Sequence, residues 1–453
     1  MYETDLVFDI EKEPSRDVLC LDCISFYASV ECIERGLDPL KAKLVVMSYP
    51  SDDPELRGSG LILASSRMAK KAYGISNVSR ARDLPFPYPP DLTIAAPRML
   101  LYMKKNQEIN NIYKKYADEA NHHVYSVDES FLDVTNSIKL FGCKNAYELA
   151  LKIQKDVQKN TGIYVTVGIG DNPLLAKLAL DNAAKRTKDM IAEWRYEDVP
   201  NTLWRIKDIT DFWGIGNKTA IRLKRMGIQT VYDLAHTNYY VLKDRLGVMG
   251  AQLYAHSWGI DRSFLGDSVK QASKSIGNSQ VLDKDYTYRS EIEIVLLEMA
   301  DQVATRLRRS GAKAQVISLF CGYSMGYLDQ DGKRGFHQQM KVPATNSSKE
   351  INQYLKQIFD RHYKYQDIRT IGVNTGGLIY TDALQLNLFE DFDRQVDQAK
   401  IEHVVDTIRR KFGFKSIVHA VSLLEGGRAI ARSSLIAGHA GGMAGIESGE
   451  SHG

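Results

Sequence analysis

The chain has 453 residues, which is too long for one compact domain and predicts roughly three or four domains. Its apolar fraction of 44% and charged fraction of 25% are those of a globular protein. The formal net charge is only +3, so any affinity for nucleic acid must come from local basic patches. No apolar run approaches the roughly 20 residues of a membrane span, and the acidic start does not resemble a signal peptide, so we expect a cytoplasmic protein without a membrane partner.

The five cysteines are an odd number, which argues against a disulfide framework. Cys20 and Cys23 form a C-x-x-C, but no second pair follows and no histidine is near in sequence. The run VLCLDC is typical of a buried strand. We therefore expect buried, reduced thiols rather than a zinc or redox site.

Strands and helices alternate in the first 190 residues. We expect strands at 18–21, 44–47, 61–64, 123–127, 131–134 and 164–169. We expect helices at 26–33, 99–120, 146–160 and 174–185, the first beginning after Ser25 as its N-cap. The order predicts a ferredoxin-like α+β layout, in which one sheet carries Asp22, Asp128 and Glu129.

The second half of the chain changes character twice. From about residue 192 to 261 we expect short helices without strands, and from 273 to 380 strands and helices return, with a long helix near 292–309. A polar tail begins near residue 381 and ends in a Gly-rich stretch, 436–453, that we expect to be disordered.

Three acids stand out among these elements. Asp22 ends an apolar run, and Asp128 and Glu129 lie between two apolar runs in VYSVDESFLDV, where charge is costly unless a cation compensates it. Carboxylates that converge on two cations roughly 3.5–4 Å apart support phosphoryl transfer, and Mg²⁺ prefers such oxygen ligands. The residues alone predict a two-cation phosphoryl-transfer site, although each acid singly could be a helix cap or a solvated side chain.

Three segments, LDCISFYASVE, YSVDESFLDV and VTVGIGDNPLLAKLALDNAAK, resemble the signatures of the Y-family, or translesion, DNA polymerases. They occur in the family's order and spacing, and the resemblance extends over residues 17–389. The chain is most similar to the UmuC/ImpB-like branch of Gram-positive bacteria. The resemblance implies addition of dNTPs to the primer 3′ end of primer-template DNA, and error-prone synthesis past damaged bases in DNA repair and the SOS response.

The resemblance also implies a right-hand polymerase. Its ferredoxin-like palm would be joined to small fingers, a helical thumb with a helix-hairpin-helix, and an α/β little finger. The expected boundaries are palm 1–23 (first strand), fingers 24–97, palm 98–190, thumb 191–262, linker 263–272, little finger 273–380 and C-terminal tail 381–453.

At the active site, the resemblance implies that Asp22, Asp128 and Glu129, with the backbone carbonyl of Cys23, hold two Mg²⁺ ions. Tyr27 matches the steric gate, an aromatic ring that leaves no room for a ribose 2′-hydroxyl. Without the motif, a core tyrosine would be the better interpretation.

The stretch ILASSRMAKKAYG and the palm helix supply groups for a triphosphate. By resemblance, Ser65, Lys71 and Lys185 align with the family's triphosphate contacts, and Arg67 lies one position from the matching pattern. A solvated helix face is the alternative for this basic run.

The segment FWGIGNKTAIRLKRMGI has the form of a helix-hairpin-helix. Glycines at 214 and 216 would let backbone N–H groups approach a DNA phosphate, and Lys218 and Arg222 add charge nearby. An ordinary helix hairpin is the alternative. In the little finger, the candidate DNA contacts are Lys274, Arg306, Arg308 and Arg309.

A pentapeptide in the tail, QLNLF, resembles the bacterial peptide that binds the beta sliding clamp. Gln385 would hydrogen-bond at the groove, while Leu386, Leu388 and Phe389 fill apolar pockets. A recombinase filament or small accessory subunits are further partners that such relatives use. Two other functions stay open, namely a clamp- and DNA-binding accessory protein without catalysis and a nucleotidyl cyclase-like enzyme.

Overall fold

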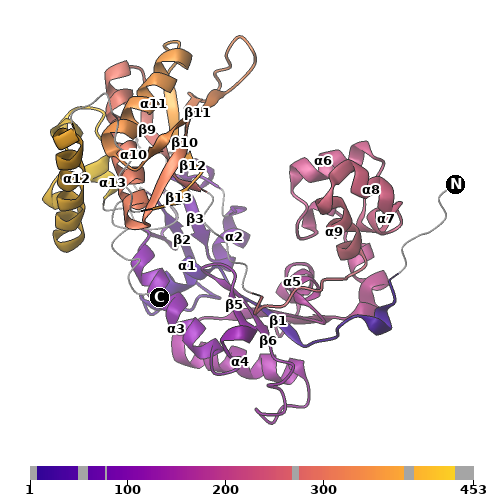
Figure 1. Cartoon of the computed structure of the whole chain (residues 1–453). Coiled ribbons are helices and arrows are strands. Elements are labelled where there is room, and N and C mark those ends of the chain that lie inside the picture. Colours follow the sequence, from indigo (N-terminus) through magenta and orange to yellow (C-terminus); the bar gives the residue numbers. More distant parts are fainter. Residues whose placement is uncertain (1–7, 49–59, 77–78, 268–274, 382–391, 434–453) are drawn as a thin grey trace. The chain divides into compact units, whose positions relative to one another are not determined.

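The computed structural model describes residues 8–48, 60–76, 79–267, 275–381 and 392–433 (Figure 1). The chain divides into two compact units, Met1–Ser268 and Val269–Gly453. No helix in the described residues is long and apolar enough to cross a membrane.

The first unit is built around a five-stranded sheet in the order β5-β6-β1-β7-β8. Its strands are β1 (Val18–Cys23), β5 (His122–Val124), β6 (Glu129–Asp133), β7 (Val165–Gly170) and β8 (Ile191–Trp194). The first four form the strand order of a ferredoxin-like fold, which confirms the expected palm. The expectation that strands stop near residue 192 was wrong, because β8 pairs in parallel with β7.

Helices cover both faces of the palm sheet. One face packs on α3 (Met99–Tyr113) and α4 (Ala146–Thr161), and the other packs on α5 (Pro173–Asn182). Side chains of β1 alternate between these layers, with Leu19 and Leu21 in the first core and Val18 and Cys20 in the second. The predicted helix 99–120 was too long, because α3 ends at Tyr113 and a turn buries Tyr116 and Ala117.

The small fingers of the first unit have their own sheet, in the order β3-β2-β4. It consists of β2 (Lys43–Met47), β3 (Ile62–Ser65) and β4 (Leu92–Ala95), and two helices accompany it, α1 (Phe26–Ile33) and α2 (Arg67–Tyr73). Ser25 stands at the N-cap of α1 as expected, but it is left-handed, with φ 45°, and its side chain makes no capping hydrogen bond. A buried cluster that includes Val45, Met47 and Ile62 holds this sheet together.

The thumb is a bundle of short helices with a separate core. Its helices are α6 (Asn217–Arg225), α7 (Val231–Ala235), α8 (Tyr239–Leu246) and α9 (Val248–Ser257). Phe212, Leu223 and Leu253 are among the buried residues of this core, which also includes side chains of α5. The helical character expected after β8 is therefore confirmed.

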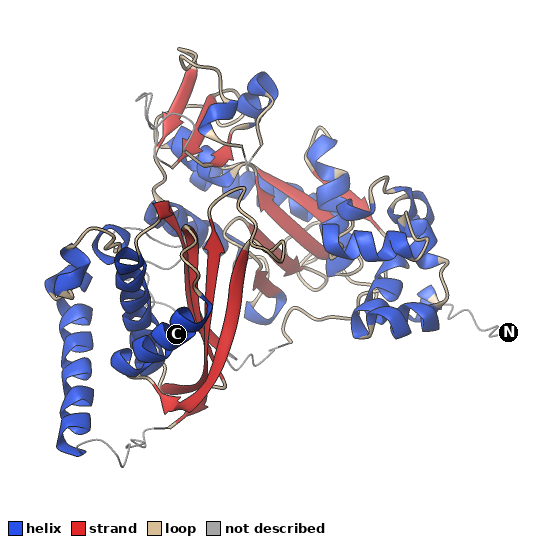
Figure 2. Ribbon diagram, turned by 90° about the horizontal axis from the view of Figure 1, so that it is seen from above, coloured by secondary structure: helices blue, strands red, loops and turns tan. Residues whose placement is uncertain are grey.

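The second unit is an α/β domain, whose helices and strands Figure 2 draws in blue and red. Its strand order is β11-β10-β12-β9, and a short β13 also pairs with β10. The strands are β9 (Ser275–Tyr286), β10 (Ala312–Tyr323), β11 (Gly335–Thr345), β12 (Ile368–Gly376) and β13 (Ile379–Tyr380). Two helices, α10 (Arg289–Arg309) and α11 (Ser348–His362), pack against the sheet through one hydrophobic core.

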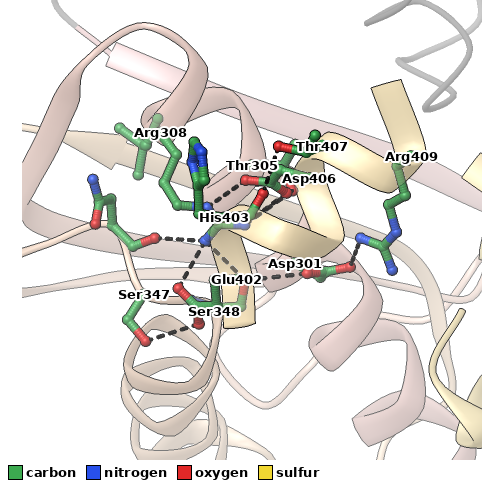
Figure 3. Close-up of polar contacts among 12 residues, drawn as sticks. Asp301, Thr305, Arg308, Ser347, Ser348, Glu402, His403, Asp406, Thr407 and Arg409 are labelled. Carbon is green, nitrogen blue, oxygen red and sulfur yellow. Dashed lines mark hydrogen bonds and ion pairs between the residues drawn. The ribbon is translucent and has the colours of Figure 1, made fainter. Parts of the chain in front are cut away.

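The expectation of a simple tail after residue 381 was wrong for residues 392–433. These residues form α12 (Phe392–Phe412), two 3₁₀ turns and α13 (Ala429–Arg432). Polar contacts attach α12 to α10 and to the start of α11 (Figure 3). Arg308 Nε lies 2.6 Å from Asp406 Oδ2, and Arg409 Nη1 lies 2.6 Å from Asp301 Oδ2. Since this contact is ionic rather than apolar, hydrophobic periodicity did not reveal it.

Other expectations for this part of the chain lie outside the described residues. They concern Lys274, the pentapeptide 385–389 and the Gly-rich stretch 436–453.

Candidate active site

The register of the palm strands brings the three acids together. Asp22 and Glu129 face each other across the antiparallel pair β1–β6, and the backbone N–H of Cys23 donates to the carbonyl of Asp128 at 2.9 Å. All four residues line one cavity of about 450 Å³. The predicted strand over 123–127 was too long, because β5 ends at Val124 and Asp128 lies in the turn before β6.

Ser126 shapes this turn, and the sequence motifs had not singled out its role. Its hydroxyl donates to Oδ1 of Asp128 at 2.7 Å and accepts from the backbone N–H of Glu129 at 3.1 Å. A local Ser–Asp contact of this kind is common in tight turns. Ser126 therefore fixes the direction in which the carboxylate of Asp128 points.

Two lysines that follow β7 reach the acids. Lys185 Nζ lies 3.1 Å from Asp22 Oδ2, and Lys177 Nζ lies 2.5 Å from Glu129 Oε1. Both lysines also form ion pairs with Asp181. Lys177 is buried, and it had been expected only as part of a helix. Neutralising the acids in this way stabilises a pocket in which burial alone would disfavour charge.

The electrostatics of the cavity favour a bound cation. The pKa of Asp22 is raised to about 6, chiefly by burial and with contributions from the charges of Asp128 and Glu129, while Lys185 opposes the shift. Among the described residues, no group of three acidic, histidine or cysteine side chains is already gathered around a cation position. The donor set nevertheless fits Mg²⁺, because Asp22, Asp128 and Glu129 all line this one cavity and carboxylate oxygens are the ligands that Mg²⁺ prefers.

The fingers supply the rest of the cavity wall. Tyr27 of α1 lines it, as do Arg67 and Lys70 of α2. Arg67 Nη2 also donates to the carbonyl of Lys185 at 2.8 Å, which links the fingers to the palm.

Two predicted triphosphate residues are placed differently. Lys71 is exposed and is not among the residues that line the cavity, and Lys70 lines it instead. Arg67 and Lys70 are one turn apart on α2, so they share the face that looks into the cavity. Ser65 is fully buried, and its hydroxyl has no hydrogen-bond partner in the described residues.

The thumb hairpin lies beside the end of α5, which carries Lys177, and beside the 3₁₀ turn after it, which carries Lys185. Gly214 adopts φ 98°, which favours glycine, and Gly216 is the N-cap of α6 in extended conformation. The segment 210–216, with Arg186 and the end of α5, lines a second cavity of about 620 Å³. On α6, Lys218 and Arg222 are exposed, although Arg222 Nη2 also donates to the carbonyl of Arg245 at 3.1 Å.

Arg308 cannot be the DNA contact that its place in a basic run had suggested. Its guanidinium is held by Glu402 at 3.0 Å and by Asp406, and its side chain is only 14% exposed. Arg306 is exposed, and its Nη1 donates to the carbonyl of Gly277 at 2.7 Å.

A ferredoxin-like palm with acids at one end of its central strands, small fingers and a hairpin thumb define a template-directed nucleotidyl-transfer enzyme. Comparisons with known proteins agree. The impB/mucB/samB family matches residues 21–181, its C-terminal domain matches residues 273–388, and the thumb domain of DNA polymerase-iota matches residues 210–261.

Full-length relatives extend the match. The chain is 38% identical to the UV-damage repair protein UvrX of Bacillus subtilis, over 96% of this chain and 100% of that protein. It is 35% identical to DNA polymerase IV 2 of the same organism, over 93% of this chain and 98% of that protein. A chimeric Y-family DNA polymerase of known structure superposes with a TM-score of 0.62 over 81% of this chain and 100% of the other, at 23% identity.

The chain belongs to the impB/mucB/samB family, the UmuC-like branch of the Y-family DNA polymerases. It is a translesion DNA-directed DNA polymerase, an enzyme class that depends on metal and acts on primer-template DNA and dNTPs.

Proposed function

We propose that the chain adds dNTPs to a primer 3′ end by two-metal-ion transfer at the cavity between β1 and β6. The observation that carries this proposal is the cross-strand placement of Asp22 and Glu129, with Asp128 in the adjoining turn. Two Mg²⁺ ions would be held by these acids and the backbone carbonyl of Cys23. When bound, they would activate the primer hydroxyl and neutralise charge on the triphosphate.

The surrounding side chains would bind and select the nucleotide. Lys185, Arg67 and Lys70 provide positive charge for the triphosphate on the side of the fingers. Tyr27 would lie beneath the sugar and exclude a ribose 2′-hydroxyl. The exposed Lys218 of the hairpin would bind DNA phosphate independently of base sequence.

The pentapeptide 385–389 would tether the enzyme to the beta sliding clamp, which suits a polymerase that binds a replication site transiently. A recombinase filament or small accessory subunits would be further partners in an SOS response. Because primer-template DNA in a bacterium lies in the cytoplasm, the enzyme would work there.

Primer extension across an abasic site tests the catalytic proposal. We expect the full chain with Mg²⁺ and dNTPs to extend the primer, and Asp128→Ala to lose at least about 1000-fold in rate while it still binds primer-template DNA. Glu197→Ala is the control, because Glu197 is exposed and does not line the cavity. Equal extension by Asp128→Ala and the full chain would remove Asp128 from the site. Adding the sliding clamp to the same reaction should increase extension, and Phe389→Ala should cancel that increase.

A further inference from the structure

The ring of Tyr27 does not stand alone at the cavity. It stacks on the ring of Tyr102, with ring centroids 4.4 Å apart and planes 16° from parallel. Tyr102 belongs to α3 of the palm and is fully buried, whereas Tyr27 belongs to α1 and lines the cavity. One face of the Tyr27 ring therefore rests on a core side chain from a different element.

Tyr102 is itself held by a buried carboxylate. Its hydroxyl donates to Oε1 of Glu31 at 2.7 Å, and both residues have no exposed surface. Burial raises the pKa of the Tyr102 hydroxyl, and the bond to Glu31 raises it further, so the hydroxyl stays protonated and donates. A charge-assisted bond of this kind restricts the ring more than packing alone does.

Glu31 is fixed by two arginines. Nε and Nη2 of Arg98 donate to its two carboxylate oxygens at 2.9 and 2.8 Å, and Arg35 Nη1 also bonds it. Burial would raise the pKa of Glu31, but the bonds from Arg98, Tyr102 and Arg35 lower it below the ordinary value. Glu31 therefore remains charged, and the bidentate contact with Arg98 ties α1 to the start of α3.

Steric selection of a sugar depends on how firmly the excluding ring is held. A ring free to move by about 1 Å would admit a hydroxyl that a fixed ring excludes. The ring of Tyr27 also lies near that of Phe26, with centroids 5.8 Å apart and planes tilted by 49°. Stacking on Tyr102 is thus the contact best placed to stop Tyr27 from swinging away from the nucleotide.

We propose that Tyr102, Glu31 and Arg98 form a support that holds the Tyr27 ring in place and so determines how strongly deoxyribonucleotides are preferred over ribonucleotides. The inference rests on the proposed role of Tyr27 as the steric gate. Tyr102 and Glu31 are positioning residues, because they act on the substrate only through the gate ring.

The test is the ratio of kcat/KM for a dNTP to that for the matching rNTP, measured on undamaged primer-template DNA with the full chain. We expect Tyr102→Leu, which removes the stacking surface, to lower this ratio by about tenfold or more. Tyr102→Phe keeps the ring but loses the bond to Glu31, so its ratio should fall less, by about two- to fivefold. Glu31→Gln, which weakens the bond to Tyr102, should behave like Tyr102→Phe.

A matched control lies nearby. Tyr116 is also buried, donates its hydroxyl to a carboxylate, Asp156 Oδ2 at 3.1 Å, and contacts the ring of Phe141 at 4.7 Å, but it does not line the cavity. Tyr116→Leu should lower stability without changing the ratio. A loss of folded enzyme reduces kcat/KM for both nucleotides alike and cancels in the ratio.

Tyr27→Ala separates the two proposals. If it lowers the ratio while Tyr102→Leu and Tyr102→Phe leave the ratio unchanged, Tyr27 is the steric gate but Tyr102 does not hold it in place, which overturns the inference. If Tyr27→Ala leaves the ratio unchanged while dNTP incorporation persists, Tyr27 is not the steric gate, and the proposed role of Tyr102 is overturned as well. If all the Tyr27 and Tyr102 variants lower the ratio and Tyr116→Leu does not, the inference holds.

Discussion

At the scale of single residues, we expect pH to act on the docking of α12 through His419. Its Nε2 lies 3.6 Å from Oδ2 of Asp301, which also pairs with Arg409. The contact with Asp301 raises the pKa of His419 above its ordinary value, burial and Arg409 oppose this, and Glu298 adds to it. A pKa raised by folding means stability that is present below the unfolded value and is lost as pH rises through the folded value.

We therefore predict that α12 is held more firmly near pH 6 than near pH 8.5. Hydrogen exchange of α12 amides, corrected for the intrinsic effect of pH, should show greater protection at the lower pH. His419→Gln should remove this difference, because glutamine cannot gain a proton. His403→Gln is the control, since His403 is exposed on the same helix. The same pH difference in His419→Gln would show that another group is responsible.

Residue by residue, the sequence motifs predicted much of the cavity. Five residues that the motifs had singled out line the cavity, namely Asp22, Asp128, Glu129, Tyr27 and Lys185. Placement on a short helix is harder to predict, because a shift of one residue turns a side chain by about 100°. This explains why one lysine of the pair KK lines the cavity and its neighbour is exposed.

Partners that are distant in sequence were harder still to predict. Lys177 stands in the apolar run LLAKLAL, where a lysine gives no sign that it will reach Glu129 from another element. Tyr102 and Glu31 are likewise separated in the chain and meet only when α3 packs on α1. Such contacts follow from the packing of elements, which no single-sequence pattern describes.

At the scale of elements, the position of α5 depends on two glycines in β7. A Cβ at Gly168 would lie 2.0 Å from the carbonyl oxygen of Ala176, and one at Gly170 would lie 2.4 Å from its backbone nitrogen. Both neighbours are backbone atoms of α5, so they cannot move without moving the helix. The close approach of α5 to β7 in turn carries Lys177 to the acids.

We predict that Gly168→Ala pushes α5 away from the sheet and lowers the free energy of unfolding of the first unit by about 3 kcal/mol or more. Incorporation of dNTPs should also fall, because Lys177 moves with α5 and the turn that follows α5 carries Lys185. Denaturant unfolding and primer extension check the two effects. Gly216→Ala is the control for stability, since a Cβ there would meet no atom within 4 Å and its φ is −85°. Equal stability of Gly168→Ala and the unchanged chain would contradict the account.

Element types were predicted better than element ends. The palm order emerged from alternating apolar patterns, yet α3 ended earlier than predicted and β8 was missed. In β8, IAEW offers only a short, mixed pattern, and its pairing with β7 is what makes it a strand. Likewise, α12 attaches by ion pairs, and a polar helix of that kind reads in sequence like a solvated tail.

At the scale of the whole molecule, the two units have separate hydrophobic cores, and the C-terminal helices belong to the second. Asp301 and Arg308 of α10 find their main charged partners in α12, and the carboxylate of Glu298 joins α10 to the start of α13. Glu298 Oε2 accepts from the backbone N–H of Arg428 and of Ala429, at 2.9 and 3.0 Å. These residues therefore complete the helical layer of the second unit.

Two truncations test whether α12 and α13 stabilise the second unit. A chain that ends after Ser433 keeps every described contact of α12 and α13, so its second unit should unfold like that of the full chain. A chain that ends after Tyr380 loses the partners that Asp301, Arg308 and Glu298 have in α12 and α13, although Ser348 still bonds Asp301 and Arg308. We predict that this lowers the free energy of unfolding of the second unit by roughly 2–5 kcal/mol, since several charge-assisted bonds are lost and the face of α10 is left with unmatched charges.

Calorimetry resolves the unfolding of the two units, and amide exchange in α10 reports on the second unit directly. The longer truncation also removes the pentapeptide 385–389, so stability rather than clamp-dependent activity is the measure that decides. In the full chain, Arg409→Met should reproduce part of the loss, because it leaves the buried Asp301 without its closest cation. If the chain ending after Tyr380 unfolds like the chain ending after Ser433, then α12 does not contribute to the stability of the second unit, and its ion pairs only set the position of α12.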